Sequence, residues 1–300
     1  MNSLRSYRYR VVDVFTSQPL EGNALAVFPD AAGLDDATMQ KIAKELNLSE
    51  TTFVTPATRA DCAANVRIFT PTKELIFAGH PTIGTSFVLL EEGIVPKDSE
   101  RFALEEKVGP VSIRIEQGRV EPGDCPLIWL TTPPISYGRT LDRGLCARAL
   151  GLEPSDLLEI APQLLSAGNP TVFVAVTDKE AVDRAWLDPL GMTTLKGAQE
   201  EPMCVFVFTP TPGGAYSRMF APEYGIIEDP ATGSSTGPLA AFMLQHRLVS
   251  GAAGGRFVSE QGVKMGRRSV LHVQLYGEQG AGGIEVGGYV SPVAEATMRL

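Results

Sequence analysis

Three side chains in this sequence are suited to proton transfer and stand in distinctive surroundings: Glu45, His80 and Asp229. His80 opens the stretch HPTIGTS and Asp229 opens DPATGSS, so a proline and then small residues follow each. Proline and small residues suit the first turn of a helix, whose unpaired N–H groups and partial positive charge can bind a carboxylate. Taken singly, such a His or Asp is equally typical of a helix cap or a turn.

The two stretches belong to a longer repetition. His80 and Asp229 are 149 residues apart, close to half of the 300-residue chain. GNALAVF at Gly22 is echoed by GNPTVFVAV at Gly168, and RIFTP at Arg67 by RMFAP at Arg218. Three matches in the same order predict an internal duplication, although Gly-Asn and Pro-Gly turns also recur by chance. A duplicated chain can build one asymmetric site at the seam, with a titratable group from each half.

Glu45 lies in KELNLSETTFV, near the end of a helix expected to begin at Asp35 or Asp36. One apolar face of this helix is predicted to comprise Met39, Ile42, Ala43 and Leu46. Asn47 is a typical left-handed stop. A carboxylate at this end of the helix meets the negative end of the dipole, which suits a general base. The alternative is a solvated glutamate. Gly84 and Gly233 are expected to let a ligand approach the backbone closely.

Composition excludes several classes of function. A net charge of −9 argues against nucleic-acid binding. The sequence has no apolar run long enough to span a membrane and no signal-peptide pattern, so we expect a cytoplasmic protein. Four cysteines without a CxxC motif and three histidines without ligand spacing predict no metal site. GxGxxG and GxxxxGK[ST] motifs are missing in the required contexts, so we expect no cofactor.

Runs rich in β-branched and aromatic residues predict strands over residues 6–15, 23–28, 51–56, 63–69, 171–177, 204–210, 215–220, 269–276 and 283–290. Further helices are expected after Pro81, over 179–186 and from about Pro238, and 139–162 is interpreted as a helical connection. The Pro/Gly-rich residues 116–126 suggest a boundary between the halves.

The motifs together resemble one known family. VDVFTSQPLEGNALAVF, IAKELNLSETTFV, RIFTPTKELIFAGHPTIGTS, EDPATGSSTGPL and SEQGVKMGRRS are similar to segments of the PhzF-like family of phenazine-biosynthesis isomerases. The resemblance implies an α+β, diaminopimelate epimerase-like fold: two similar lobes, each a barrel-like, mostly antiparallel sheet around a central helix. We therefore expect an N-terminal lobe over 1–131 and a C-terminal lobe over 132–300, with a C-terminal strand free to return to the first lobe.

The resemblance also implies a function: a cofactor-independent isomerase that shifts a proton on a small carboxylated metabolite, such as trans-2,3-dihydro-3-hydroxyanthranilate. Glu45 would be the general base, and His80 and Asp229 would orient the substrate and shuttle protons. Gly79, Gly233 and Ser234 would hold its carboxylate. Family members are expected to be homodimers without metal, nucleic-acid or membrane partners.

Two alternatives stay open: a non-catalytic ligand-binding homologue, and an epimerase acting on an amino acid derivative. Related two-lobe racemases carry a cysteine pair where this chain has His80 and Asp229, which argues against two-thiol chemistry. Arg268 departs from the family pattern, which often has proline at that position, and this leaves the nearby loop in doubt.

Overall fold

The protein has a mixed α+β fold with mostly antiparallel strands, as seen in a computed structural model that describes residues 5–117, 125–197, 201–252 and 254–300. The chain forms two compact units. Unit 1 comprises Met1–Thr131 together with Gly287–Leu300, and unit 2 comprises Thr132–Val286. Most of the segment 116–126, which the sequence suggested as a boundary, lies outside the described residues; the chain leaves unit 1 shortly after it.

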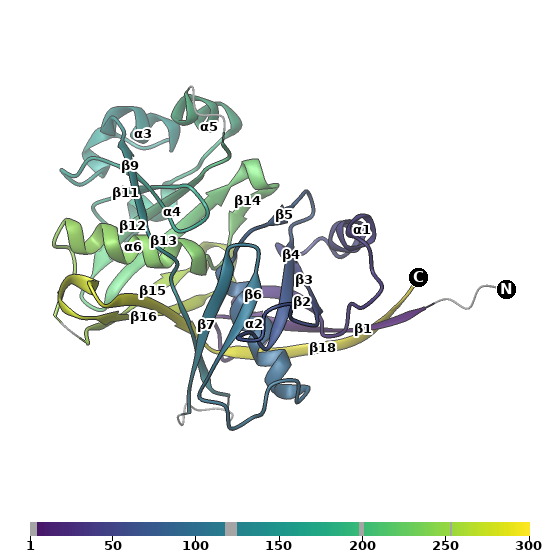
Figure 1. Cartoon of the computed structure of the whole chain (residues 1–300). Helices are drawn as coiled ribbons and strands as arrows, with labels where there is room; N and C mark the ends of the chain where they lie inside the picture. The colour runs from purple at the N-terminus through teal and green to yellow at the C-terminus, as the bar shows by residue number, and fades with distance from the viewer. Residues whose placement is uncertain (1–4, 118–124, 198–200, 253) are drawn as a thin grey trace. The chain divides into compact units, whose positions relative to one another are not determined.

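Unit 1 is built from nine strands and two helices within its described residues. They are β1 (Ser6–Val14), β2 (Asn23–Phe28), α1 (Asp36–Leu46), β3 (Glu50–Thr55), β4 (Ala64–Phe69), β5 (Glu74–Leu75), α2 (Gly79–Glu91), β6 (Arg101–Glu106), β7 (Gly109–Glu116), β8 (Leu127–Thr131) and β18 (Val290–Arg299). Helix α1 packs on β3 and β4, as Figure 1 shows. Helix α2 packs against β1, β2, β3, β8 and β18, and its first twelve residues are all buried.

The strands of unit 1 pair in a mixed order. Strand β1 is antiparallel to both β2 and β18, so the last strand of the chain is part of this unit. Strands β2 and β3 are parallel, β3 and β4 antiparallel, β4 and β5 antiparallel, β4 and β6 parallel, and β6 and β7 antiparallel. Under α1, the rings of Phe28 and Phe53 stack with centroids 5.0 Å apart, and Met39 and Ile42 of α1 belong to the same core.

Unit 2 carries most of the helices. Its elements are β9 (Ser136–Thr140), α3 (Arg143–Ala149), η1 (Pro154–Asp156), β10 (Gln163–Ser166), β11 (Thr171–Ala175), α4 (Lys179–Arg184), α5 (Pro189–Lys196), β12 (Cys204–Thr211), β13 (Gly214–Ala221), η2 (Pro222–Tyr224), β14 (Ile226–Asp229), α6 (Gly233–Gln245), β15 (Arg256–Gln261), η3 (Val263–Met265), β16 (Ser269–Tyr276), η4 (Glu278–Gly280) and β17 (Gly283–Gly288). The η elements are 3-10 helices. Strand β17 crosses the boundary back into unit 1.

The order of strand pairing in unit 2 repeats that of unit 1. Strands β11 and β12 are parallel, β12 and β13 antiparallel, β13 and β14 antiparallel, β13 and β15 parallel, and β15 and β16 antiparallel. These pairings correspond one by one to those of β2 through β7. A 13-residue buried helix stands at the same point of each order, α2 after β5 and α6 after β14.

Three expectations about elements were wrong. Helix α6 begins at Gly233 and contains Pro238, because its burial compensates for the hydrogen bond that proline cannot give. The region 139–162 is not one helical connection, since it contains the end of β9 and the short helices α3 and η1. Residues 283–290 are not one strand, since Tyr289 separates β17 from a ten-residue β18.

Candidate active site

Glu45 lies where the sequence predicted, in the last turn of α1. Asp35 caps the helix by accepting a hydrogen bond from the Thr38 N–H at 2.8 Å. The helix stops at Asn47, whose φ of 52° is left-handed and whose N–H bonds to the Ala43 carbonyl. The Glu45 side chain is exposed, and among the described residues it forms no hydrogen bond or ion pair. The Glu45 carboxylate is therefore accessible to a substrate molecule.

Two contacts fix α1 to its sheet. Arg67 of β4 forms paired hydrogen bonds to Glu74 of β5, at 2.8 Å each, and also bonds to Asp36 in the first turn of α1. The Arg67 guanidinium lies 5.2 Å from the Phe69 ring centre. Gln40 of α1 donates to the Thr70 carbonyl at 2.8 Å. These contacts hold the helix that carries Glu45.

His80 is the second residue of α2 and is 3% exposed. Its Nδ1 lies 3.2 Å from Asn23 Nδ2, and its Nε2 lies 3.3 Å from Glu50 Oε2. Asn23 and Glu50 are the first residues of β2 and β3, and both are buried. Burial lowers the pKa of His80 to about 3, so the imidazole is neutral at physiological pH.

A second carboxyl group lies buried below the start of α2. Glu106, the last residue of β6, accepts a hydrogen bond from the Thr82 hydroxyl at 2.6 Å. Its other oxygen, Oε2, is buried without a hydrogen-bond partner among the described residues. Burial raises the pKa of Glu106 to about 8, against an ordinary value of 4.5. A protonated carboxylic acid is thus the stable form near neutrality.

This raised pKa predicts a pH-dependent stability. Between about pH 4.5 and about pH 8 the folded protein keeps a proton on Glu106 that the unfolded chain releases, so the free energy of unfolding falls as pH rises. The expected slope is at most about 1.4 kcal/mol per pH unit. Glu106→Gln should remove this contribution. Urea unfolding of both proteins at several pH values would give curves that diverge toward high pH; parallel curves would contradict the prediction. The titration of His80 occurs in both the wild type and Glu106→Gln, so its effect cancels in the difference between their unfolding free energies.

Asp229 ends β14 in unit 2 and is 6% exposed. The Thr232 hydroxyl donates to Asp229 Oδ2 at 2.5 Å. Gln261, a fully buried residue of β15, donates to the Asp229 carbonyl at 2.7 Å and accepts from the Thr232 N–H at 3.1 Å. The side-chain amide of Gln261 thus links the backbone of Asp229 to that of Thr232, the residue that precedes α6.

Gly79, Gly233 and Ser234 lie in the first turns of α2 and α6, and all three are buried. Neither helix has a side-chain cap or an acidic residue in its first turn. The other four α-helices of the described chain are each capped by an aspartate: Asp35, Asp142, Asp178 and Asp188. Only α2 and α6 among these helices thus leave their first N–H groups uncapped by a carboxylate.

The sequence pattern predicts that His80 and Asp229 occupy equivalent positions of the repeat, and this prediction is wrong. His80 is inside α2, whereas Asp229 stands four residues before α6 begins. The Arg67–Glu74 pair has a counterpart in Arg218–Glu228, and the separations of 7 and 10 residues differ by three. The turn η2 occupies this interval in unit 2 only. Aligned at their helices, His80 corresponds to Ser234.

Gly84 has a packing role rather than the ligand-facing role that the sequence suggested. A Cβ added to it would lie 2.6 Å from Leu25 Cδ2 and 2.8 Å from Val14 Cγ2. The glycine therefore brings α2 close to β1 and β2. The sequence alone does not distinguish the two roles, because a glycine is equally suited to a ligand that comes close to the backbone and to a helix that packs close to a sheet.

Gly84→Val is expected to destabilise the protein by about 1–3 kcal/mol, because three extra carbons must displace buried strand side chains. Thermal unfolding monitored by circular dichroism would measure the loss. Gly93→Val would add the same carbons in open space, but the φ of +69° at Gly93 would itself strain a valine, so this variant is not a clean control. Gly84→Ala is the better comparison, because it adds one carbon at the same position and should cause a smaller loss of stability than Gly84→Val. Equal melting temperatures for wild type and Gly84→Val would refute the packing role.

Four buried residues that the sequence did not single out individually contact His80, Asp229 or the start of α2: Asn23, Glu50, Glu106 and Gln261. Asn23 stood in a repeated Gly-Asn landmark, so its recurrence was the available signal. Glu50 is a carboxylate in a strand whose other side chains are largely buried, whereas Glu106 ends a strand whose other side chains are mostly half-buried. The available signal for Glu50 was therefore a carboxylate at the start of a buried strand.

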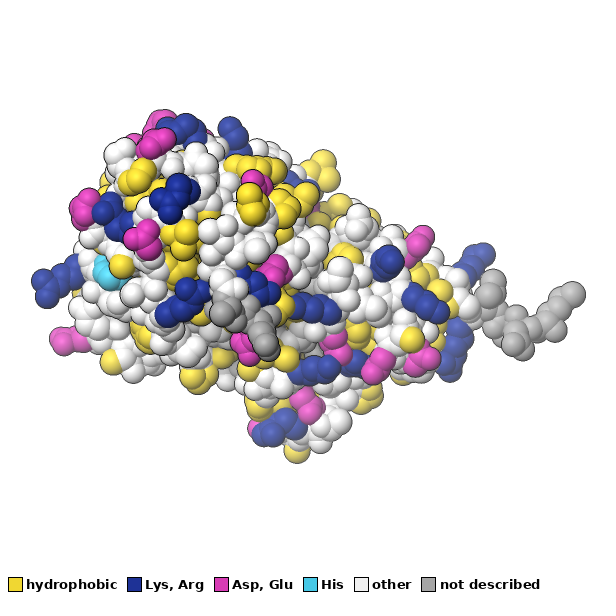
Figure 2. All heavy atoms as spheres, turned by 90° about the horizontal axis from the view of Figure 1, so that it is seen from above, with side chains coloured by type: hydrophobic (Ala, Val, Ile, Leu, Met, Phe, Trp, Pro, Cys, Tyr) yellow, Lys and Arg dark blue, Asp and Glu magenta, His cyan; other side chains and the backbone are white. Residues whose placement is uncertain are grey.

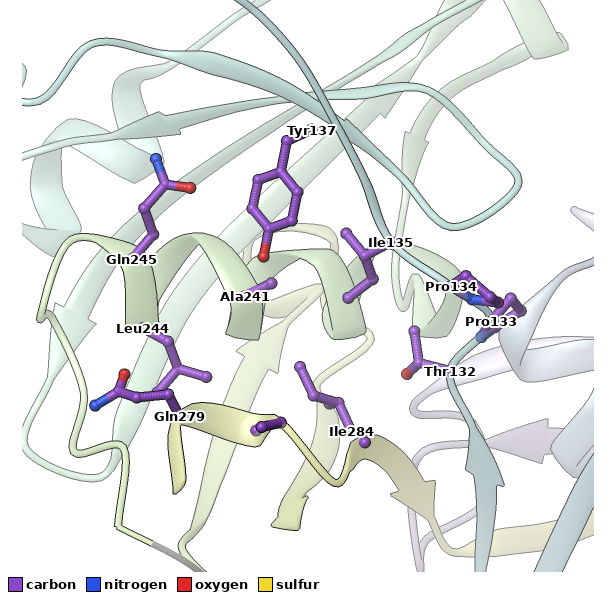
Figure 3. Close-up of a pocket in the computed structure, with 13 residues that line it drawn as sticks. Thr132, Pro133, Pro134, Ile135, Tyr137, Ala241, Leu244, Gln245, Gln279 and Ile284 are labelled. Carbon is purple, nitrogen blue, oxygen red and sulfur yellow. The ribbon is translucent and has the colours of Figure 1, made fainter. Parts of the chain in front are cut away.

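A separate pocket of about 470 Å³ lies within unit 2, shown in Figure 3. It lies between the segment after β8, the end of α6 and the turn before β17. Its lining residues are Thr132, Pro133, Pro134, Ile135, Tyr137, Ala241, Leu244, Gln245, Gln279, Gly280, Ala281, Gly283 and Ile284. They include no carboxylate, histidine, lysine or arginine, and none of the expected catalytic residues. This pocket is unsuited to the proton transfer predicted for Glu45.

The surface charges, helix lengths and possible metal ligands of the described residues can be compared with the functions that the composition argued against. Basic and acidic side chains are interspersed on the face that Figure 2 shows. None of the helices described has the length and apolar character needed to cross a membrane. No group of three or more His, Cys, Asp or Glu residues in the described ranges could hold a metal ion. Arg268 pairs with Glu260 of β15 at 2.6 Å, which gives the departure from proline a local role.

Comparison with known proteins identifies the relatives of this chain. Residues 12–296 match the family model of phenazine biosynthesis-like proteins, PhzC-PhzF. Over 98% of its length the chain is 34% identical to trans-2,3-dihydro-3-hydroxyanthranilate isomerase of Pseudomonas aeruginosa, all of which is covered. A PhzF family protein of Bacillus anthracis matches with a TM-score of 0.86, 25% identity, and coverage of 99% of this chain and 100% of that one. A structure described as a predicted epimerase from Pseudomonas aeruginosa matches with a TM-score of 0.79, 33% identity, and coverage of 97% and 99%.

These likenesses define an enzyme of the isomerase class. The chain belongs to the phenazine biosynthesis-like, or PhzC-PhzF, family, which confirms the resemblance noted in its motifs.

Proposed function

We propose that this isomerase moves a proton on a small carboxylated metabolite without a cofactor, with Glu45 as the general base. The proposed substrate is trans-2,3-dihydro-3-hydroxyanthranilate. The observation that carries the proposal is the 34% identity, over nearly the whole chain, to an isomerase of that substrate. The exposed, unpaired carboxylate of Glu45 at the end of an anchored helix is the group suited to the task.

In this proposal Glu45 removes the C3 proton of the substrate and returns a proton to another carbon of the conjugated system. The bond made and the bond broken are both C–H bonds, so the reaction needs no oxidant and no reductant. A proton beside an extended π-system is acidic enough for a carboxylate base, provided that fixed dipoles meet the developing charge. General-base catalysis of this kind contributes about 10²- to 10⁴-fold to a rate.

The uncapped helices α2 and α6 support a carboxylate-binding role for Gly79, Gly233 and Ser234. Each helix presents free N–H groups and the positive end of its dipole. Every other described α-helix satisfies these groups with an aspartate, so the two exceptions are consistent with groups kept for a ligand. The substrate carboxylate would accept these hydrogen bonds, together with one from the Ser234 hydroxyl.

His80 and Asp229 are proposed to orient the substrate and to relay protons. A neutral imidazole can donate one hydrogen bond and accept another, whereas an ionised carboxylate accepts only. The two residues therefore offer different hydrogen-bonding characters to one substrate. The proposal requires residues of unit 1 and unit 2 to act on the same molecule.

An internal duplication is proposed as the origin of the two units. It is supported by the repeated order of strand pairing and by a repeated side-chain cluster. Arg218 pairs with Glu228 and lies 5.0 Å from the Phe220 ring centre, as Arg67 pairs with Glu74 and lies 5.2 Å from Phe69. Such agreement in both backbone and side chains favours descent from one ancestral half.

The test is turnover of trans-2,3-dihydro-3-hydroxyanthranilate by the purified protein in deuterated buffer. We expect a change in the ultraviolet spectrum and a product carrying solvent deuterium at the carbon that receives the proton. No spectral change and no exchange into the substrate would refute this substrate. Light scattering of the same sample would test the homodimer that the family resemblance implies.

An epimerase is the second candidate, favoured by the 33%-identical structure described as a predicted epimerase. Epimerisation would exchange one C–H proton for solvent deuterium and invert that centre without changing the conjugation. Chiral chromatography of amino acid derivatives incubated with the protein would reveal it. The alternative of a non-catalytic binding protein gains no support from relatives named as isomerases.

A further inference from the structure

The Gly-Asn landmark of the first half places an amide against the His80 ring. Gly22 has a φ of +64°, and a Cβ there would lie 2.3 Å from the Val14 carbonyl oxygen, so this turn requires glycine. The turn delivers Asn23, which is 1% exposed, to the start of β2. Asn23 Nδ2 then lies 3.2 Å from His80 Nδ1. An amide nitrogen only donates, so Nδ1 of His80 accepts.

This contact decides which nitrogen of a neutral His80 carries the proton. If Nδ1 accepts, the single ring proton is on Nε2, which lies 3.3 Å from Glu50 Oε2. A second proton would have to enter at Nδ1, where it would face the amide hydrogens of Asn23. The arrangement therefore opposes both the other tautomer and the imidazolium, although Glu50 alone would favour a cation.

Other titratable groups near α2 do not change this assignment. Of the strands that pack on α2, β1 carries the buried Asp13, whose Oδ2 accepts from the Leu20 N–H at 2.6 Å. Glu106 of β6 contacts the helix through Thr82. Glu50 is the group that contacts the imidazole, and it does so at Nε2.

A Gly-Asn turn in the second half of the chain makes an equivalent contact. Gly168 has a φ of +114°, and the following Asn169 donates from Nδ2 to Ser234 Oγ at 3.4 Å. Ser234 is the second residue of α6, as His80 is the second residue of α2. A hydroxyl oxygen that accepts the Asn169 hydrogen keeps its own hydrogen for another acceptor. Two Gly-Asn turns thus reach equivalent positions in two helices.

We propose that Asn23 and Asn169 are positioning residues: Asn23 holds His80 as the neutral tautomer with its proton on Nε2, and Asn169 orients the Ser234 hydroxyl to donate. The hydrogen-bond assignment stands on the contacts within each unit. Its importance for turnover rests on the function proposed above for His80 and Ser234. The inference therefore separates into a spectroscopic part and a kinetic part.

The spectroscopic test is nitrogen NMR of the ¹⁵N-labelled full chain, which contains three histidines, His80, His246 and His272. His80→Asn identifies the signals of His80. We expect the wild-type ring to show Nε2 protonated and Nδ1 unprotonated from about pH 5 to about pH 9. In Asn23→Asp a carboxylate would face Nδ1, so the proton should move to Nδ1 or the ring should become cationic.

Controls keep the test decisive. Asn169→Asp makes the same change in unit 2 and should leave the His80 signals in place. If Asn23→Asp does not fold, Asn23→Ser removes most of the amide's reach and should give a mixture of tautomers. A wild-type His80 protonated at Nδ1, or an Asn23→Asp spectrum identical to wild type, would overturn the inference.

The kinetic arm uses the substrate of the proposed function. Asn23→Asp should lower kcat by about 10²-fold with little change in KM, because it disturbs a proton-relay group rather than binding. A moved proton with unchanged kcat would refute the catalytic importance of the tautomer. Lack of turnover by wild type would refute the substrate instead, and the NMR result would stand independently.

Discussion

Glu45→Gln is expected to lower kcat for trans-2,3-dihydro-3-hydroxyanthranilate by about 10²- to 10⁴-fold while leaving the fold intact. The amide has nearly the shape of the carboxylate but cannot take a proton. Glu45 is exposed and forms no ion pair with another described residue, so its replacement breaks no stabilising contact. Ultraviolet assays and solvent-deuterium exchange would measure the loss, and circular dichroism would verify folding.

The neighbouring residue provides the matched control. Lys44 is exposed in the same last turn of α1, so Lys44→Gln changes one charge at the same helix end. We expect this variant to keep most of the activity, with a stability change of about 0.5 kcal/mol or less. Glu45→Gln with nearly normal kcat, or an equal loss in Lys44→Gln, would show that Glu45 is not the base.

Arg218→Ala should destabilise the protein by about 3–5 kcal/mol, because it leaves the Glu228 carboxylate, whose side chain is only 12% exposed, unpaired. Arg218 forms two hydrogen bonds of 2.8 Å to Glu228 and donates to the carbonyls of Val182, Asp183 and Ala185. These carbonyls stand at the end of α4, so the variant also loosens that helix. Urea unfolding of wild type and variant would measure the difference.

The repeated cluster in unit 1 supplies the comparison. The Arg67 side chain is 20% exposed against 5% for Arg218, so Arg67→Ala should cost less. A double variant, Arg218→Met with Glu228→Gln, removes both charges of this largely buried pair and should recover part of the loss. Small and equal losses in Arg218→Ala and Arg67→Ala would argue against a buried, charge-dependent pair. Comparison of the two variants thus measures how burial changes the contribution of an Arg–Glu ion pair to the free energy of unfolding.

Local patterns predicted much of the fold because several elements carry complete signals. Strand-forming residue types gave β2 at its observed bounds and β4 to within one residue, and capping by Asp35 with a stop at Asn47 gave α1. Helix α6 was placed too late because Gly233 to Gly237 are weak helix formers, and only burial makes them helical. Pairings such as β4 with β6 join distant segments, and no local pattern encodes them.

The candidate site was predictable in part. Glu45, His80 and Asp229 stood out through residue type and surroundings, and Gly79, Gly233 and Ser234 entered by family resemblance. The correspondence of His80 with Ser234 was hidden, because three extra residues around η2 shift the repeat between Arg218 and Glu228. The Asn23 and Glu50 contacts to His80 were hidden as well, since they join three separate segments of unit 1.

The pairing of β18 with β1 has a consequence for how the chain acquires its structure during synthesis. Unit 2 is one continuous stretch, Thr132–Val286, so its strands can all pair as soon as it leaves the ribosome. Unit 1 must wait for β18, which brings Arg299 opposite Ser6. Until β18 has been made, β1 can pair only with β2, so we expect unit 1 to be the last part of the chain to resist proteolysis.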